Sequence, residues 1–186
     1  MRKRYIVTIL TALAMVAYLA LDDHQAKVAI VAQDLIDQEP DYIVEKLTAD
    51  SFNESGELSQ QINALKATHY PNGDITVLEK PSIILYETGT PKWGISSDVG
   101  NLQQQNKILL KGRVIIVPLS PQGGDFSLTT DSLNVDLVSQ MADTDDKVVI
   151  ESDSSELLAT GMNILLNQQF VTFKSQVRGR HDPKAK

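Results

Sequence analysis

From residue 40 onward, apolar and polar residues alternate along the sequence, and this period of two constrains the fold more than any other feature. In one segment Leu133, Val135 and Leu137 share a face, and a second alternating segment runs from Val171 to Val177. Such alternation is typical of strands with one buried and one solvated face. No segment after residue 40 shows a long helical apolar period. We therefore expect an all-β domain built from antiparallel strands.

Clusters of turn-forming residues divide this region into short segments. They are NESGE (53–57), YPNGD (70–74), TGTPK (88–92) and SPQGGD (120–125). In the second cluster, Asn72 and Gly73 stand between two alternating segments, which is a strong signal for a β-hairpin. The clusters therefore predict a chain of hairpins.

A weak internal repeat runs through the same region. Copies begin at Ile95, Leu128 and Leu158, spaced by 33 and 30 residues, and a more divergent copy begins at Leu58. Each copy begins with an apolar residue, followed by two small residues and an Asp or Gly, which we call the small-residue step. An alternating strand, a polar turn and a second strand complete the copy. Repeats of this length indicate stacked units that bury a shared face, although any β protein produces some similarity of this kind by chance. The repeat favours stacked hairpins in a jelly roll or a β-solenoid groove.

The N-terminus carries an apolar segment behind a basic cluster. Residues 5–21 contain no charge, residues 2–4 are all basic, and Asp22 and Asp23 follow. As a helix, this segment would span about 25 Å, enough for a thin hydrocarbon core. The basic residues should remain in the cytoplasm, which places the rest of the chain outside it. We predict a cytoplasmic tip (1–4), a transmembrane helix (5–21), a periplasmic linker (22–39) and a periplasmic β domain (40–186).

Two other interpretations of the N-terminus are a cleaved signal peptide and a buried core helix. Cleavage after Ala20 would need a small residue where Tyr18 stands, and cleavage after Ala17 would need one where Met15 stands. A core helix would show a polar face, which this segment lacks. Both patterns favour a retained anchor in the inner membrane.

Composition excludes several classes of function. The chain has no cysteine, so disulfides and thiolate metal sites are ruled out. Without the three basic residues at positions 2–4, the exported part has 14 basic against 24 acidic residues. Such a surface is unsuited to nucleic acid, and aromatic residues make up only 5% of the chain. We expect no nucleic-acid partner.

Signatures of catalysis are also missing. His24, His69 and His181 are far apart in the sequence, without metal-ligand spacing. There is no nucleophile elbow and no phosphate-binding loop. The DTDD segment (143–146) lacks the ligand pattern of a calcium loop, and we interpret it as a solvated turn. We therefore predict a protein that is not an enzyme and holds no metal or cofactor.

Several segments of the chain match one known family in order and spacing. They are EPDYIVEKLTADSFNESGELSQQINALKATHY (39–70), LEKPSIILYE (78–87), PKWGISSDVG (91–100), LLKGRVII (109–116) and LTTDSLNVDL (128–137). Together with an N-terminal anchor, they make the chain resemble the LptC family of the lipopolysaccharide export system.

The resemblance implies a fold, a function and partners. The fold would be an open, twisted β-jelly roll whose interior holds the acyl chains of lipopolysaccharide. The lipid would arrive from the inner-membrane ABC transporter complex LptB/LptF/LptG and pass to the periplasmic bridge protein LptA. The alternative that we keep is an anchored periplasmic adaptor that binds only proteins.

Apolar residues along the strands are the candidates for the lipid-binding interior. They are Leu47, Ile62, Leu78, Trp93, Ile95, Leu110, Val135, Val171 and Phe173. The resemblance assigns lipid contact to Leu47, Leu78 and Val171. At position 47 the family commonly carries a smaller polar residue, and at position 78 an aromatic one, so this chain keeps or increases the apolar surface at both. The alternative for each residue is a place in an ordinary core.

The remaining candidates concern the edges and bends of the sheet. The last strand, QQFVTFKSQVRG (168–179), has no later segment to cover it, so Val171, Phe173 and Val177 become candidates for partner binding. Tyr42 marks the opposite edge. Gly112 and Gly161 occupy similar positions within strands, and we expect both to have structural roles at bulges or close backbone approaches.

Overall fold

The computed structural model describes residues 39–120 and 124–181. The predicted transmembrane helix and nearly all of the predicted linker lie outside these residues. Within the described ranges, no helix has the length and apolarity needed to span a membrane. The description below therefore concerns the β domain.

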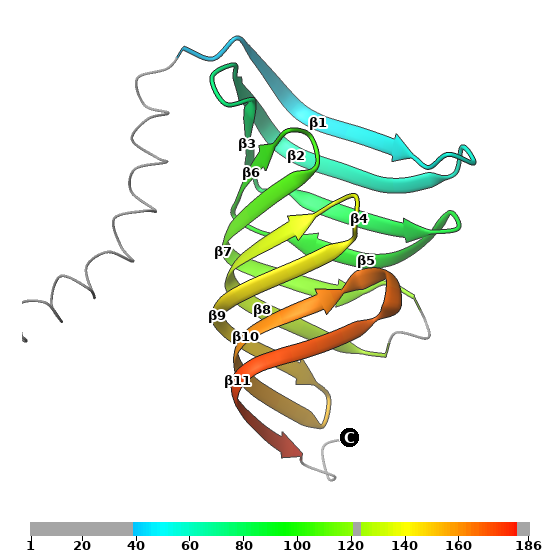
Figure 1. Cartoon of the computed structure of the whole chain (residues 1–186), viewed down its shortest axis with the longest axis vertical. Helices are drawn as coiled ribbons and strands as arrows, with labels where there is room; N and C mark the ends of the chain where they lie inside the picture. The colour runs from blue at the N-terminus through cyan, green and yellow to red at the C-terminus, as the bar shows by residue number, and fades with distance from the viewer. Residues whose placement is uncertain (1–38, 121–123, 182–186) are drawn as a thin grey trace, which may run out of the picture. The chain divides into compact units, whose positions relative to one another are not determined.

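The described chain forms antiparallel strands joined into one 11-stranded sheet (Figure 1). The strands are β1 (Tyr42–Phe52), β2 (Leu58–Tyr70), β3 (Ile75–Glu79), β4 (Ser82–Glu87), β5 (Thr90–Ser96), β6 (Val99–Gln103), β7 (Lys107–Pro118), β8 (Phe126–Asp136), β9 (Met141–Ser152), β10 (Ser155–Leu165) and β11 (Phe170–His181). A short 3-10 turn, η2 (Leu166–Gln168), joins the last two. The predicted all-β antiparallel class is confirmed, and the predicted hairpin turn at Asn72-Gly73 joins β2 to β3.

The sheet divides into two layers between β2 and β7. Residues 60–63 of β2 pair with β4, while residues 66–70 pair with β3. In the same way, residues 107–111 of β7 pair with β6 and residues 115–118 pair with β5. Two routes of hydrogen bonding, β3–β6 and β4–β5, therefore connect β2 with β7. We call the two halves of the sheet the β3–β6 layer and the β4–β5 layer.

The long strands pass from one layer to the other at a line of register shifts, which we call the crease. The β7–β8 pairing shifts between Lys111 and Val114, and the pairings from β8 to β11 each shift near their middles. Positive φ angles occur along this line at Gly112, Gly161 and Gln176. Such bulges bend a strand and increase its twist. The crease thus folds one continuous sheet around a shared interior.

The repeated small-residue step seen in the sequence coincides with the crease. Ser97-Asp98 joins β5 to β6, while Thr130-Asp131 and Thr160-Gly161 lie at the shifts of β8 and β10. Each copy of the repeat is therefore a hairpin whose first segment crosses between the layers. Short side chains suit this position because the backbone bends sharply there. The predicted stacking of hairpins agrees with this arrangement.

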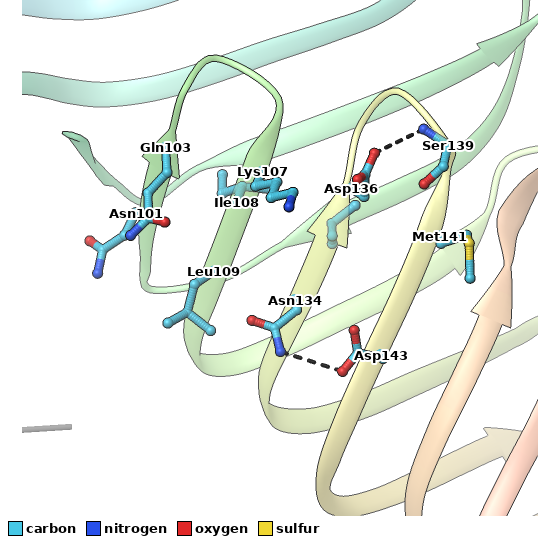
Figure 2. Close-up of a pocket in the computed structure, with 11 residues that line it drawn as sticks. Asn101, Gln103, Lys107, Ile108, Leu109, Asn134, Asp136, Ser139, Met141 and Asp143 are labelled. Carbon is cyan, nitrogen blue, oxygen red and sulfur yellow. Dashed lines mark hydrogen bonds between the residues drawn. The ribbon is translucent and has the colours of Figure 1, made fainter. Parts of the chain in front are cut away.

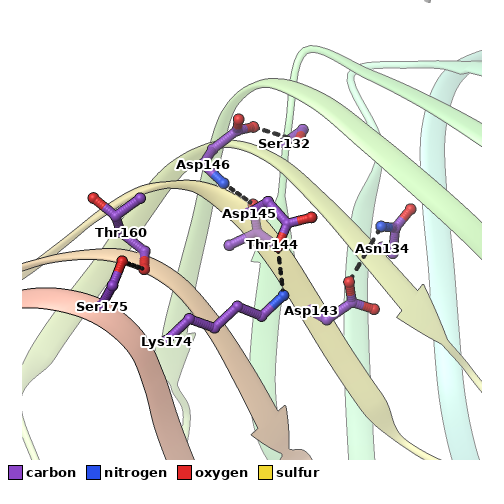
Figure 3. Close-up of polar contacts among 9 residues, drawn as sticks. All are labelled: Ser132, Asn134, Asp143, Thr144, Asp145, Asp146, Thr160, Lys174 and Ser175. Atoms are coloured by element: carbon purple, nitrogen blue, oxygen red, sulfur yellow. Dashed lines mark hydrogen bonds and ion pairs between the residues drawn. The ribbon is translucent and has the colours of Figure 1, made fainter. Parts of the chain in front are cut away.

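The DTDD segment is not a solvated turn, so that interpretation was wrong. Residues 143–146 lie inside β9, where Thr144 is 2% exposed. The register shift directs the acidic side chains outward, and the surrounding strands supply partners (Figure 3). Lys174 Nζ lies 2.6 Å from Asp145 Oδ1, and the Ser132 hydroxyl donates to Asp146 Oδ2 at 2.5 Å.

Lys174 also explains the second crease glycine. A Cβ atom added at Gly161 would lie 2.7 Å from Lys174 Cδ, closer than real Cβ contacts allow. The φ angle of +71° also favours glycine. Gly161 therefore allows the Lys174 chain to cross β10 and reach Asp145.

The core lies between the two layers and forms one continuous cluster. Its largest fully buried side chains are Leu78, Ile83, Leu85, Ile95, Ile108, Leu110, Ile116, Leu128, Leu133, Met162, Ile164 and Val114. Each aliphatic side chain of this size stabilises the fold by roughly 1.5–3 kcal/mol when fully buried. The predicted alternation in β8 is confirmed, because Leu133, Val135 and Leu137 are all buried while Asn134 is exposed.

Candidate functional site

The nine candidate lipid-binding residues meet in the interior between the layers. Six of them are buried, namely Ile62, Leu78, Trp93, Ile95, Leu110 and Val135. The other three, Leu47, Val171 and Phe173, are partly buried and pack against the same cluster. Residues from β1 to β11 thus contribute to one apolar interior.

Both layers supply this interior. Leu78, Leu110 and Val135 come from the β3–β6 layer, and Trp93 and Ile95 come from the β4–β5 layer. Several equally buried residues were not among the predicted lipid-binding residues: Ile83, Leu85, Ile108, Val114, Ile116, Leu128, Met162 and Ile164. Strand alternation could have found most of them, since they occur at every second position on β4, β7 and β10.

The interior is filled by the protein's own side chains in this structure. Leu78 and Leu110 have no exposed surface, and Ile95 retains 1%. Side chains packed to this degree leave no space for an acyl chain beside them. Entry of any ligand among these side chains would therefore require the two layers to move apart.

An open apolar cavity lies at the β1 end of the interior. It has a volume of about 180 Å³ and includes Leu47 and Leu78, two of the three positions that the family resemblance assigns to lipid. Tyr42 and Val44 of β1 and Leu102 of β6 also line it. The cavity gives access from solvent to one end of the core.

A histidine that the sequence analysis dismissed lies at the rim of this cavity. His69 Nδ1 is 2.6 Å from Asp41 Oδ1, and its Nε2 is 3.1 Å from Asp74 Oδ1. The ring also stacks on Tyr42, with 4.6 Å between centroids. Hydrogen bonds to Asp41 and then to Asp74 raise the pKa of His69 above its ordinary value. No local sequence signal indicated this cluster, because Asp41 lies 28 residues from His69.

A larger cavity of about 400 Å³, lined by both apolar and polar residues, lies over β6 to β9 (Figure 2). Its lining includes the polar side chains of Asn101, Gln103, Asn134 and Asp143. Asp136 accepts hydrogen bonds from the backbone N–H groups of Ser139 at 2.9 Å and Val138 at 3.0 Å. Those bonds, Ser139 first, lower the pKa of Asp136 and fix the β8–β9 turn. Hydrogen bonds within the β8–β9 turn thus explain why the pKa of Asp136 is lowered.

The candidate partner-binding residues lie on the two outer strands. Tyr42 is 50% exposed on β1, which pairs with β2, and Val177 is 53% exposed on β11, which pairs with β10. Val171 and Phe173 lie on the part of β11 before its register shift, and Val177 lies within the shift, between the paired residues Ser175 and Arg178. Among the described residues, neither β1 nor β11 has a strand on its other side. Both edges therefore offer backbone groups to an additional strand.

Comparisons with known proteins agree on one family. Residues 7–182 match the family model described as "Lipopolysaccharide-assembly, LptC-related". The chain is 23% identical to the lipopolysaccharide export system protein LptC of Escherichia coli K12, over 80% of this chain and 77% of that protein. It is 24% identical to the protein of the same name from Haemophilus influenzae, over 75% of each. Because the family model spans most of the sequence, this chain belongs to the LptC-related lipopolysaccharide-assembly family.

Proposed function

We propose that this protein is a membrane-anchored component of lipopolysaccharide export. It receives the lipid from the inner-membrane ABC transporter complex LptB/LptF/LptG and passes it to the periplasmic bridge protein LptA. The transfer route is the apolar interior between the two layers. The protein itself performs no chemistry on the lipid in this proposal.

The observation that carries this proposal is the continuity of the interior from one sheet edge to the other. Leu47 on β1 and Phe173 on β11 pack against the same cluster of buried residues. An ordinary core needs no apolar surface at two outer strands, whereas a relay needs it at both. A neighbouring strand added at either edge would extend the interior without exposing acyl chains to water.

Charge favours contact with acyl chains over contact with the lipid headgroup. Lipopolysaccharide headgroups carry phosphates, and the exported part of this chain has 14 basic against 24 acidic residues. Like charges repel across the surface. The protein therefore holds the acyl chains and leaves the phosphorylated sugars in solvent.

Photo-crosslinking in cells tests the proposal at neighbouring positions of β3. Leu78 is buried in the interior, and Glu79, the next residue, is exposed. A photo-reactive amino acid at position 78 should crosslink to lipopolysaccharide when the extractor is active, and one at position 79 should do so far less. Position 47 gives a second interior probe at a site that is only partly buried. Equal labelling at positions 78 and 79 would contradict a one-faced interior.

The anchor is part of the same proposal. The basic residues 2–4 followed by the uncharged residues 5–21 support retention in the inner membrane. The mature protein should keep its N-terminal residues and fractionate with the inner membrane. An N-terminus near Leu21 or Asp22, found by mass spectrometry, would show cleavage instead.

The alternative, an adaptor that binds only proteins, makes a different prediction about bound lipid. Full-length protein purified with its membrane partners should carry acylated glycolipid, detectable by native mass spectrometry. A preparation that binds LptA and the transporter but never lipid would favour the adaptor.

A further inference from the structure

We propose that Trp93 and Leu166 form a latch that closes the interior on the side opposite the crease. This inference rests on the proposed function, because it concerns how a lipid reaches the interior. The latch joins the β4–β5 layer, which carries Trp93, to the turn after β10, which carries Leu166. Its opening admits the acyl chains.

The strand topology places this side of the fold away from the crease. From the crease, the strands of the β3–β6 layer run to the turns at 71–74, 104–106, 137–140 and 166–169. The strands of the β4–β5 layer run to a second row of connections that includes 53–57, 88–89 and 153–154. We call the opening between these two rows the mouth. Covalent bends join the layers at the crease, so side-chain contacts must hold them together toward the mouth.

One such contact is a buried hydrogen bond between residues far apart in the sequence. The Trp93 indole Nε1–H donates to the Leu166 carbonyl oxygen at 2.9 Å, across 73 residues. Trp93 is 6% exposed and Leu166 is 2% exposed. A buried donor that loses its acceptor incurs a desolvation penalty. The bond therefore favours the closed arrangement of the layers.

Each partner is fixed within its own layer. The Trp93 ring meets Phe126 of β8 edge-on, with 6.3 Å between centroids, and its strand pairs with both β4 and β7. The Leu166 N–H donates to the Gln140 carbonyl at 2.9 Å, which ties η2 to the β8–β9 turn. If the layers separate, Trp93 and Leu166 must therefore move with different layers, and the hydrogen bond between them must break.

The position of η2 suits a movable element. It follows β10 and leads directly into β11, which pairs on one side only within the described residues. Gln169, the C-cap residue that follows it, has a positive φ of 54°. The turn that holds the latch is thus adjacent to an edge strand, where fewer hydrogen bonds oppose movement. The filled interior makes such a movement necessary for lipid uptake.

Cross-linking tests the latch directly, because the native chain contains no cysteine. Lys92 and Asn167 line one small cavity together with Trp93 and Leu166, but they belong to opposite layers. Full-length Lys92→Cys/Asn167→Cys protein in detergent is joined with a reducible bis-methanethiosulfonate reagent, and uptake of fluorescent lipopolysaccharide is followed. We expect uptake to fall at least tenfold and to recover on reduction.

The matched control joins two strands of the same layer. Glu87 on β4 and Lys92 on β5 form an ion pair at 2.9 Å within the β4–β5 layer. The Glu87→Cys/Lys92→Cys protein, joined with the same reagent, should take up lipid at the rate of the unmodified protein. Mass spectrometry confirms the joined species in each sample.

A second variant removes the hydrogen bond and keeps an aromatic ring. Trp93→Phe should take up lipopolysaccharide about fivefold faster, the factor expected from losing one net hydrogen bond of average strength. Thr48→Val, which removes a donor to Asn63 between β1 and β2, is the control and should leave the rate unchanged. Trp93 is the single tryptophan of the chain, so its emission in the native protein should change as lipid binds.

The outcomes separate the latch from the proposed function. Undiminished uptake by the Lys92/Asn167 cross-linked protein, or lipid binding without any change in Trp93 emission, would overturn the latch and leave the relay intact. If native protein takes up no lipopolysaccharide at all, the proposed function fails and the latch fails with it.

Discussion

Asp98 lies directly against the α-carbon of Gly112, so that a Cβ atom built on this glycine would be 2.8 Å from the Asp98 Oδ2 atom. The Asp98 N–H also donates to the Gly112 carbonyl at 2.8 Å. Lys80 Nζ lies 2.5 Å from Asp98 Oδ1, and this bond lowers the pKa of the carboxyl group. The three residues connect the β3–β4 turn, the β5–β6 step and the bend of β7. Gly112 therefore holds together the part of the crease where the two layers rejoin.

Replacing Gly112 with alanine should reduce the free energy of unfolding by about 2–3 kcal/mol. The φ of +75° is unfavourable for a residue with a Cβ atom, and Asp98 must also move. Gly89→Ala is the matched control, because its φ is +69° but nothing lies within 4 Å of the added Cβ. It should cost only the backbone strain, about 1–2 kcal/mol. Denaturant unfolding of the full-length protein in mild detergent measures both, and equal losses would show that the Asp98 contact is unimportant.

His69 should stabilise the β1 end in a pH-dependent way. Its pKa is raised in the folded state by Asp41 and Asp74, so protonated His69 favours folding. The stabilisation should be fully present below the unfolded-state pKa of about 6.5. It should be lost as the pH rises through the higher folded-state value. The difference in melting temperature between native protein and His69→Gln should therefore be larger at pH 6 than at pH 9.

The control for this prediction is His181→Gln at the other end of the sheet. The His181 ring lies 2.7 Å from the Ser155 hydroxyl instead of a carboxylate. This replacement removes a histidine–hydroxyl contact, so it shows how the melting temperature responds to the loss of a hydrogen bond that involves no carboxylate. A His69→Gln effect that is constant with pH would mean that the contact is steric and that protonation of the ring does not contribute.

Leu110→Ala should destabilise the fold by about 2–5 kcal/mol, the range for truncating a large aliphatic residue in a well-packed core. Leu110 has no exposed surface and lies in β7, where the layers rejoin. Leu65→Ala, at a position 64% exposed on β2, should change stability by no more than about 0.5 kcal/mol. A small effect at Leu110 in lipid-free protein would indicate a loose interior that is already open to ligands.

Deletion of residues 168–186 should abolish binding to LptA while the complex with the transporter still assembles. The deletion removes β11, including Val171, Phe173 and Val177, and begins after the latch residue Leu166. Removal of residues 182–186 alone should leave LptA binding intact. Co-purification from cells measures both complexes. A truncated protein that still retains LptA would place the contact elsewhere, most simply at the β1 edge near Tyr42.

Much of the fold follows from local pattern. The alternation of Leu133, Val135 and Leu137 indicated a half-buried strand, and Asn72-Gly73 indicated a hairpin, because both depend on neighbouring residues alone. The small-residue step repeated from Ile95 onward coincides with the crease. The sequence showed that the step repeats, but it did not show that the strands bend there. The order of the strands from β7 to β11 also follows from stacked hairpins, since each of these strands pairs with its neighbour in the chain.

The sequence by itself determined the all-β class, the hairpin turns and most of the apolar face, because a period of two assigns each side chain to one side of a strand. Only the tertiary structure decided how the sheet splits at β2 and β7, since that depends on two strands competing for one edge. It also placed Asp145 within a strand beside Lys174, where sequence pattern suggested a turn. The pairing of Trp93 with Leu166 across 73 residues has no local signal, because it arises only when the folded layers face each other.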